Sequence, residues 1–137
     1  MTTEDNAQLG WVILYVPDPG EAIALYERAF GMSRRFVAEG NSYAELDTGS
    51  TTLAFASTGL GEGNFEGGVQ QPDLSARPFN VELALVFARV EPAFARAVEH
   101  GCIAVSEPAR KPHGQTVGWL RDPFGNLIEI ASPLDNG

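Results

Sequence analysis

The sequence predicts an α+β fold built from two tandem βαβββ modules, whose sheets curve round a shared cleft. The same order of strand and helix patterns occurs twice, and a stretch rich in Gly, Gln and Pro separates the two copies. A length of 137 residues, 44% of them hydrophobic, suits one compact domain. We therefore expect a single domain over residues 1–137, with module one at about 9–57, a linker at 58–78 and module two at about 79–132.

Module one begins with a short apolar strand, WVILYV, at 11–16. Asp18 is a typical helix N-cap, and Pro19 suits the first turn of a helix. The apolar residues of this helix recur at the spacing of one buried stripe and are Ile23, Tyr26 and Phe30. Gly31 then supplies the left-handed residue that commonly ends a helix, so we expect the helix to end at Phe30.

Three strand patterns complete module one. They are RRFVAE at 34–39, SYAELD at 42–47 and TTLAFA at 51–56. A tight turn at Thr48-Gly49 predicts that the second and third pair as a hairpin. The Gly-rich residues 59–68 that follow lack the Lys-Ser/Thr ending of a phosphate loop, and we interpret them as a mobile flap over the cleft.

Module two repeats this order. NVELALVF at 80–87 is a strand, and a helix from about Val90 to His100 stops at Gly101. Its apolar face comprises Phe94, Ala97 and Val98. Strands are then expected at CIAV (102–105), GQTVGWLR (114–121) and LIEIA (127–131), and Asp122 is expected to cap the turn before the last strand by accepting from backbone amides.

Two carboxylates interrupt apolar strands of module two. Glu82 alternates with residues that fill the helix side of its strand, and Glu129 lies between Ile128 and Ile130. Both carboxylates should therefore face the hollow. At about 4 Å apart, their repulsion would be on the order of 4 kcal/mol at an effective dielectric near 20, enough to protonate one of them or to demand a cation.

The overall composition excludes several classes of protein. A net charge of −9 argues against a phosphate-binding basic surface and hence against nucleic acid. No apolar run reaches the length of a membrane helix, and the N-terminal stretch has no signal pattern, so we expect a cytoplasmic protein. Cys102 is the single cysteine, which excludes an internal disulfide. Acidity favours cationic ligands.

Two stretches carry a recognisable family pattern: LGWVILYVPDPGEAIALYERAFGM at the start and KPHGQTVGWLRDPFGNLIEIASP at the end. The latter combines a glycine-bearing strand, an Asp-Pro-x-Gly-Asn turn and a final strand with a glutamate. Over about residues 9–132 the chain resembles the vicinal oxygen chelate superfamily of glyoxalases, bleomycin resistance proteins and extradiol dioxygenases. By this resemblance alone we expect a homodimer.

Metal-using members of that superfamily take ligands from the first and last strands of each module. The resemblance places Trp11, Leu53, Glu82 and Glu129 at these positions. Indole offers only a donor N–H and Leu53 offers no ligand atom, whereas a catalytic metal normally keeps three or more protein ligands. We therefore expect no cofactor. The alternative is a divalent Zn, Ni, Mn or Fe ion held by Glu82 and Glu129 with help from His113 or a partner chain.

Aromatic residues are candidates for ligand contact. Trp11 and Trp119 are either core or flat surfaces for a planar ligand, and Leu53 and Phe55 share one face of their strand. His113 precedes a long strand and is either exposed or placed at the cleft mouth as a base. His100 ends a helix, where a cation complements the helix dipole, so a structural role explains it.

Three functions follow from these residues. The first is a protein that binds a small molecule, a drug or natural product that is planar and, given the acidity, cationic, as in the bleomycin resistance branch. The second is a metal-dependent lyase, isomerase or dioxygenase of the glyoxalase type, with Glu82 and Glu129 as catalytic residues. The third is metal-free acid–base chemistry by the same pair, one of them with a raised pKa.

Overall fold

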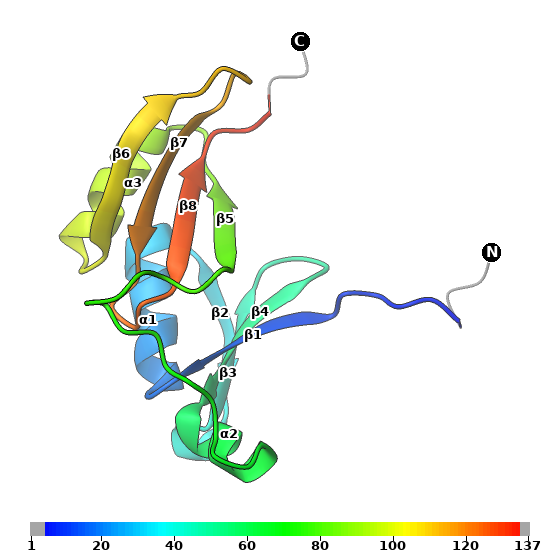
Figure 1. Ribbon diagram of the computed structural model, residues 1–137. Coiled ribbons are helices and arrows are strands. Elements are labelled where there is room, and N and C mark those ends of the chain that lie inside the picture. Colours follow the sequence, from blue (N-terminus) through cyan, green and yellow to red (C-terminus); the bar gives the residue numbers. More distant parts are fainter. Residues whose placement is uncertain (1–4, 135–137) are drawn as a thin grey trace. The chain divides into compact units, whose positions relative to one another are not determined.

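The computed structural model describes residues 5–134, and it divides into two compact units that we call module one and module two (Figure 1). Each unit contains a four-stranded sheet and one long helix in the order βαβββ. The predicted α+β fold with its repeated order of elements is therefore confirmed. In the described part of the chain, no helix is long and apolar enough to cross a membrane.

Module one consists of β1 (Trp11–Val16), α1 (Pro19–Phe30), β2 (Ser33–Val37), β3 (Tyr43–Asp47) and β4 (Thr52–Ser57), with a single 3-10 turn at Glu39–Asn41. The strand order in the sheet is β1-β4-β3-β2, with β1 parallel to β4 and the other pairs antiparallel. A parallel pair needs a long crossover, and α1 with the two strands after it supplies that connection.

Helix α1 has the predicted bounds because both of its ends are set by local chemistry. The Asp18 carboxylate accepts a hydrogen bond from the Glu21 amide at 3.1 Å, and Gly31 takes the left-handed conformation at φ 70°. On the sheet side, the Tyr26 ring lies edge to face against Phe55, with centroids 4.9 Å apart. This contact identifies the face of the sheet that α1 covers.

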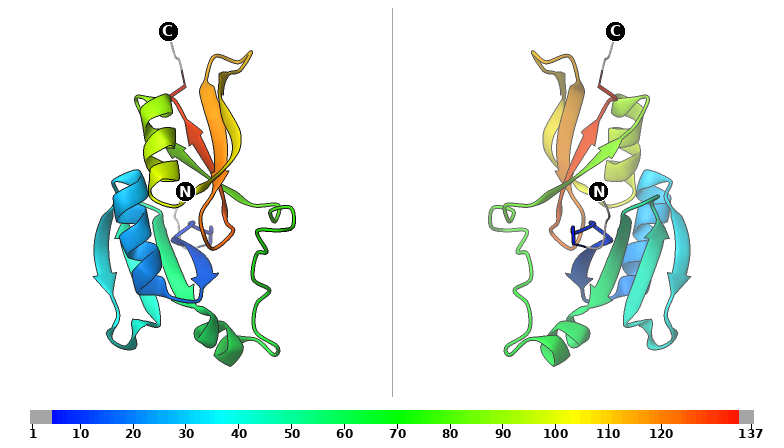
Figure 2. Two further views of the ribbon diagram at one scale, coloured as in Figure 1. Left: turned by 90° about the vertical axis from the view of Figure 1, so that its left-hand side faces the viewer. Right: turned by 90° about the vertical axis from the view of Figure 1, so that its right-hand side faces the viewer.

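Module two consists of β5 (Glu82–Val86), α3 (Val90–Glu99), β6 (Ile103–Arg110), β7 (Thr116–Arg121) and β8 (Leu127–Ala131). The sheet order β5-β8-β7-β6 repeats that of module one, and Figure 2 shows α3 lying along one face of this sheet. The helix-covered face is apolar and fully buried at Leu120, Ile128 and Ile130. The opposite, open face carries Glu82, Trp119 and Glu129.

Two segments differ from the sequence-based expectation. Strand β6 extends to Arg110 instead of ending near 105, because two register shifts let it stay paired with β7 past Ser106. The Gly-rich segment expected to be a flap forms the short helix α2 (Thr58–Asn64), capped by the Ser57 hydroxyl. This helix is followed by Phe65, whose ring packs edge to face on Tyr15 with centroids 6.1 Å apart.

The later part of the linker is held by module two. The Arg121 guanidinium donates to the carbonyl oxygens of Ala76 at 2.7 Å, Asp73 at 3.3 Å and Gly125 at 3.0 Å. Asp122 caps the turn as predicted, accepting from the amides of Phe124 and Asn126. Arg121 is thus a buried clamp on the linker rather than a group that faces a ligand.

Candidate functional site

The open face of module two brings three of the predicted site residues together. The Trp119 indole N–H donates to Glu82 Oε1 at 3.2 Å. Because β8 lies between β7 and β5, the Trp119 side chain extends over β8 to make this contact. Glu129 lies on β8 directly beside Trp119 in the strand register and beside Ala84 of β5. The carboxyl group of Glu82 lies close enough to that of Glu129 to affect its acidity.

This arrangement changes the acidity of Glu129. Partial burial, together with the adjacent carboxyl group and negative charge of Glu82, raises the pKa of the Glu129 carboxyl to about 7, and the nearby charge of His113 opposes this rise. A neighbouring like charge disfavours ionisation, and a bound cation would relieve that repulsion. Near neutral pH, Glu129 therefore exchanges between the carboxylic acid and the carboxylate.

A pocket of about 340 Å³ opens on this face. The Lys111 ammonium lies 5.5 Å from the centre of the Trp119 ring, and His113 Nε2 is 2.8 Å from Gln115 Oε1. Both side chains come from the segment before β7. The residues lining the pocket are Lys111, Pro112, His113, Gln115, Val117, Trp119 and Glu129. The pocket thus combines an aromatic wall, a carboxyl group and a lysine already placed over the ring.

The open face of module one is closed by its own side chains. Glu45 is 8% exposed and accepts hydrogen bonds from the Trp11 indole at 3.0 Å and the Tyr43 hydroxyl at 2.7 Å. Arg35 Nη1 donates to Glu45 Oε1 at 3.1 Å and to Thr52 Oγ1 at 3.1 Å. The carboxylate is therefore paired with a guanidinium and with two neutral donors.

The same contacts set the acidity of both partners. The Tyr43 hydrogen bond lowers the pKa of Glu45, and the Trp11 and Arg35 contacts lower it further against the opposing effect of burial. Burial together with the Glu45 carboxylate raises the pKa of Tyr43 to about 12. Glu45 therefore stays ionised, with its oxygens bound by Tyr43, Trp11 and Arg35.

The strand registers relate the two faces position by position. One row across the sheet of module one consists of Ile13, Ala54 and Glu45, on β1, β4 and β3. The equivalent row of module two consists of Ala84, Glu129 and Trp119, on β5, β8 and β7. Glu45 therefore corresponds to Trp119, and Trp11 corresponds to Glu82. Each module has one Trp–Glu hydrogen bond across the sheet, with the two residues exchanged between the strands.

The repeat also reveals what module two lacks. A register shift follows Arg34 in β2, and an equivalent shift follows Ala104 in β6, so Val105 occupies the place of Arg35. Among the ion pairs found within residues 5–134, none involves Glu82 or Glu129. In module one, Arg35 thus pairs with both Glu45 and Asp47, whereas the two carboxyl groups of module two take part in no ion pair within residues 5–134.

The positions expected to hold metal ligands do not form a metal site. In the strand register of module one, the residue that corresponds to Glu129 is Ala54 and not Leu53. Leu53 therefore shares the helix-covered face with Phe55. Neither Trp11 nor Ala54 offers a lone pair to a metal. Across residues 5–134, no three side chains of His, Cys, Asp or Glu lie close enough together to hold a metal ion. The donor set does not fit a catalytic divalent ion.

The remaining candidates lie outside this face or away from its chemistry. Leu53 and Phe55 are buried, Phe55 packs on Tyr26 of α1, and neither lines the pocket at Trp119. Cys102 is buried, and this burial raises the pKa of its thiol to about 12, which suits a core residue. Sequence reasoning missed Arg35 and Lys111. The available signal was Glu45 between Ala44 and Leu46 in a strand pattern, because a carboxylate that becomes buried in a sheet needs a cation or donors nearby.

Comparisons with known proteins agree with this fold. A family model described as Glyoxalase/Bleomycin resistance protein/Dioxygenase superfamily matches residues 8–130. No curated protein matches the chain significantly. A glyoxalase-related enzyme from Fulvimarina pelagi has a TM-score of 0.78 and 22% identity, over 92% of this chain and 88% of that chain.

Two further solved structures are similar to the chain. A glyoxalase/bleomycin resistance protein/dioxygenase family enzyme from Burkholderia phytofirmans PsJN has a TM-score of 0.75 and 19% identity, over 92% of this chain and 98% of that one. A glyoxalase/bleomycin resistance protein/dioxygenase from Nocardioides has a TM-score of 0.71 and 18% identity, over 97% and 87% of the two chains. At these identities the likeness shows a shared fold.

Proposed function

Since the chain belongs to the glyoxalase/bleomycin resistance protein/dioxygenase superfamily, we propose that it binds a small molecule, a planar organic cation, in the pocket on the open face of module two. The observation that carries this proposal is the Glu82–Glu129 pair beside Trp119, which takes part in no ion pair among residues 5–134. A drug or natural product with a flat cationic group would supply the positive charge that balances the carboxyl pair. The protein would release this ligand chemically unchanged.

Module one supports the choice of cation. There the fold places its own guanidinium, from Arg35, against the carboxylate on the same face. A guanidinium or amidinium is planar, donates through a fixed fork to carboxylate oxygens and stacks on aromatic rings. In module two, Val105 leaves that place empty of charge, and the carboxyl pair offers acceptors. The Lys111 ammonium lies over the Trp119 ring at 5.5 Å, so a planar cation would stack on this ring by displacing the lysine side chain. We therefore expect amidines and guanidines to bind better than amines.

The binding test is a calorimetric titration with benzamidine and with its neutral counterpart benzamide at pH 8. At that pH Glu129 is largely ionised, since its pKa is about 7. We expect benzamidine to bind at least about tenfold more tightly than benzamide, which corresponds to about 1.4 kcal/mol. Benzylamine tests whether the planar fork matters, because it carries the same charge on a tetrahedral nitrogen.

Variants of the carboxyl pair complete the test. Glu82→Gln and Glu129→Gln should each weaken benzamidine binding, whereas Glu39→Gln, at an exposed position in module one, serves as the control for net charge. Equal affinity for benzamidine and benzamide would refute the proposed function. Mass spectrometry of the recovered ligand checks that it is unchanged.

A second candidate function is metal-free acid–base catalysis. The specific observation is that Glu129 has a pKa of about 7 next to His113 and a pocket that can hold a substrate. A general acid or base is most effective when its pKa lies near the working pH. Chemical change of a bound substrate that is lost in Glu129→Gln with binding retained would favour this function over simple capture.

A further inference from the structure

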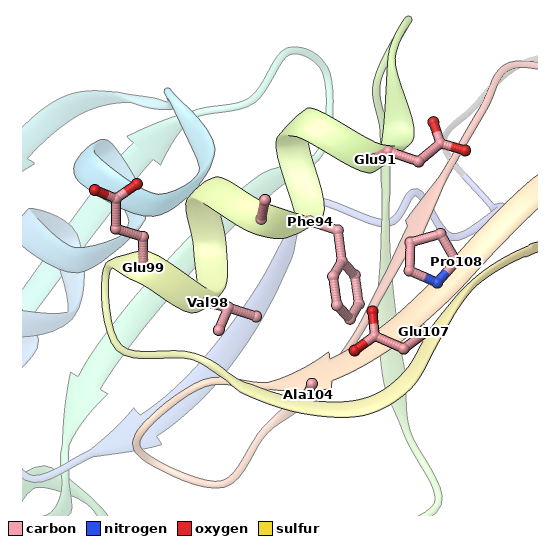
Figure 3. A pocket seen from close by; sticks show the side chains of 8 residues that line it. Glu91, Phe94, Val98, Glu99, Ala104, Glu107 and Pro108 are labelled. Carbon is pink, nitrogen blue, oxygen red and sulfur yellow. The ribbon is translucent and has the colours of Figure 1, made fainter.

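A second hollow, of about 580 Å³, lies between α3 and β6 on the helix side of module two. Figure 3 shows the Phe94 ring pointing from α3 toward the strand that carries Ala104 and Glu107. The floor is apolar and consists of Phe94, Val98, Ala104 and Pro108. This hollow is separate from the pocket at Trp119, because the two share no lining residue.

The corresponding place in module one is closed by an ion pair. Arg34 on β2 donates to both carboxylate oxygens of Glu27 on α1, at 3.0 and 2.8 Å. Arg34 corresponds to Ala104, because Arg34 pairs with Leu46 in module one and Ala104 pairs with Leu120 in module two. Glu27 corresponds to Val98, because each lies nine residues after the N-cap of its helix, which is Asp18 in α1 and Arg89 in α3. Val98 and Ala104 therefore replace the two charged residues that span the groove in module one.

Backbone irregularity opens the groove further. Strand β6 has two register shifts, and the second lies between Ser106 and Ala109, next to Glu107 and Pro108. Beneath them, a Cβ on Gly118 would lie 3.1 Å from the Phe94 ring, so the ring rests on the glycine and fixes the floor. The hollow thus results from specific substitutions and bulges in module two.

The rim of the hollow is acidic. Glu91 and Glu99 stand on α3 and Glu107 on β6, and all three are exposed. Of the ion pairs found in residues 5–134, none includes these glutamates. Three carboxylates around an apolar floor attract a molecule with an apolar body and a positive charge, and they repel an anionic one.

We propose that the groove between α3 and β6 is a second binding site, which takes an amphipathic organic amine with its apolar part on Phe94 and Val98 and its ammonium group at the glutamate rim. A neutral molecule of the same shape would lose the charge contacts, and an anion would be disfavoured. This site is independent of the pocket at Trp119 and of the function proposed there.

The test is an NMR titration of the ¹⁵N-labelled chain with 3-phenylpropylamine, with 3-phenylpropanol as its neutral counterpart. We expect saturable shifts of amides in α3 and β6, and an affinity for the amine about tenfold higher than for the alcohol. Glu107→Gln should weaken amine binding severalfold and leave alcohol binding unchanged, whereas Glu39→Gln should alter neither.

A closing variant tests the geometry directly. The double substitution Val98→Glu with Ala104→Arg copies the ion pair of module one, and both positions are exposed, so the fold should persist. This variant should lose the amine-dependent shifts in α3 and β6. Retained binding in the variant, equal affinity for amine and alcohol, or no saturable shifts in these elements of the original chain would each overturn the proposal.

Discussion

Trp11 and Glu82 occupy the same position in the two copies of the sheet, and each is hydrogen-bonded to a residue two strands away with donor and acceptor exchanged. Trp11 donates to Glu45 at 3.0 Å, and Glu82 accepts from Trp119 at 3.2 Å. The exchange leaves the carboxylate of module one next to Arg35 and that of module two next to Glu129. One face is thus self-neutralised, while the other needs a proton or a cation.

Installing the missing arginine should close the pocket at Trp119. In Val105→Arg, a guanidinium should lie over the open face and compete with an external cation. We expect benzamidine binding to fall at least about tenfold, and the pKa of Glu129 to fall, because a nearby positive charge favours the carboxylate. Calorimetry and NMR titration of the carboxyl group measure the two effects. Val105→Gln, which adds length without charge, should change neither appreciably.

Stability should fall as pH rises through the titration of Glu129. Its folded pKa of about 7 lies above the ordinary value of 4.5, so the stabilisation from its protonated form is complete below about 4.5 and is lost as pH rises through about 7. Glu129→Gln should flatten this dependence in urea unfolding measured from pH 4.5 to 8. An unchanged slope in the variant would contradict a raised pKa of Glu129.

Removing the charge of Glu45 should destabilise module one. In Glu45→Gln, Arg35 loses its buried carboxylate, and we expect a loss of about 2 kcal/mol in the free energy of unfolding at pH 7. Because the folded pKa of Glu45 is lowered, its contribution is present above the unfolded pKa of about 4.5 and is lost as pH falls through the folded value. The difference between the two proteins in urea unfolding should therefore shrink in acid.

Gly118 should tolerate no side chain. A Cβ at this position would meet the Pro108 nitrogen at 3.0 Å and the Phe94 ring at 3.1 Å, and both are held by the β6 bulge and the core. We expect Gly118→Ala to lower stability by about 1–3 kcal/mol through overpacking. Gly10, where a Cβ would meet nothing within 4 Å, provides the matched control. Thermal unfolding of both variants makes the comparison.

Metal loading should give far less than one ion per chain. The open face of module two offers Glu82 and Glu129, and the corresponding positions in module one offer no lone pair, which is too few ligands for a firmly bound catalytic ion. Elemental analysis after saturation with Zn, Ni, Mn and Fe(II), followed by desalting, measures the stoichiometry. About one ion per chain, lost in the double variant Glu82→Ala with Glu129→Ala, would make a metal-dependent enzyme the better proposal.

Several features could be predicted from the sequence because their causes are local. The bounds of α1 follow from Asp18 and Gly31, and the turn before β8 follows from Asp122, since capping groups act on amides a few residues away. The alternation in β5 and β8 placed Glu82 and Glu129 on one face for the same reason. A Gly-rich segment has low helix propensity, so α2, which contacts β1 and β4, was missed.

The sequence by itself thus determined the two βαβββ modules and the carboxyl pair of module two. Only the tertiary structure decided which side chains neutralise which charges. The bulge after Arg34 turns Arg35 toward Glu45. The strand register makes Ala54, rather than Leu53, the residue of module one that corresponds to Glu129. Strand register and bulges arise from pairing between segments far apart in the chain, and a slip of one residue exchanges the two faces of a strand.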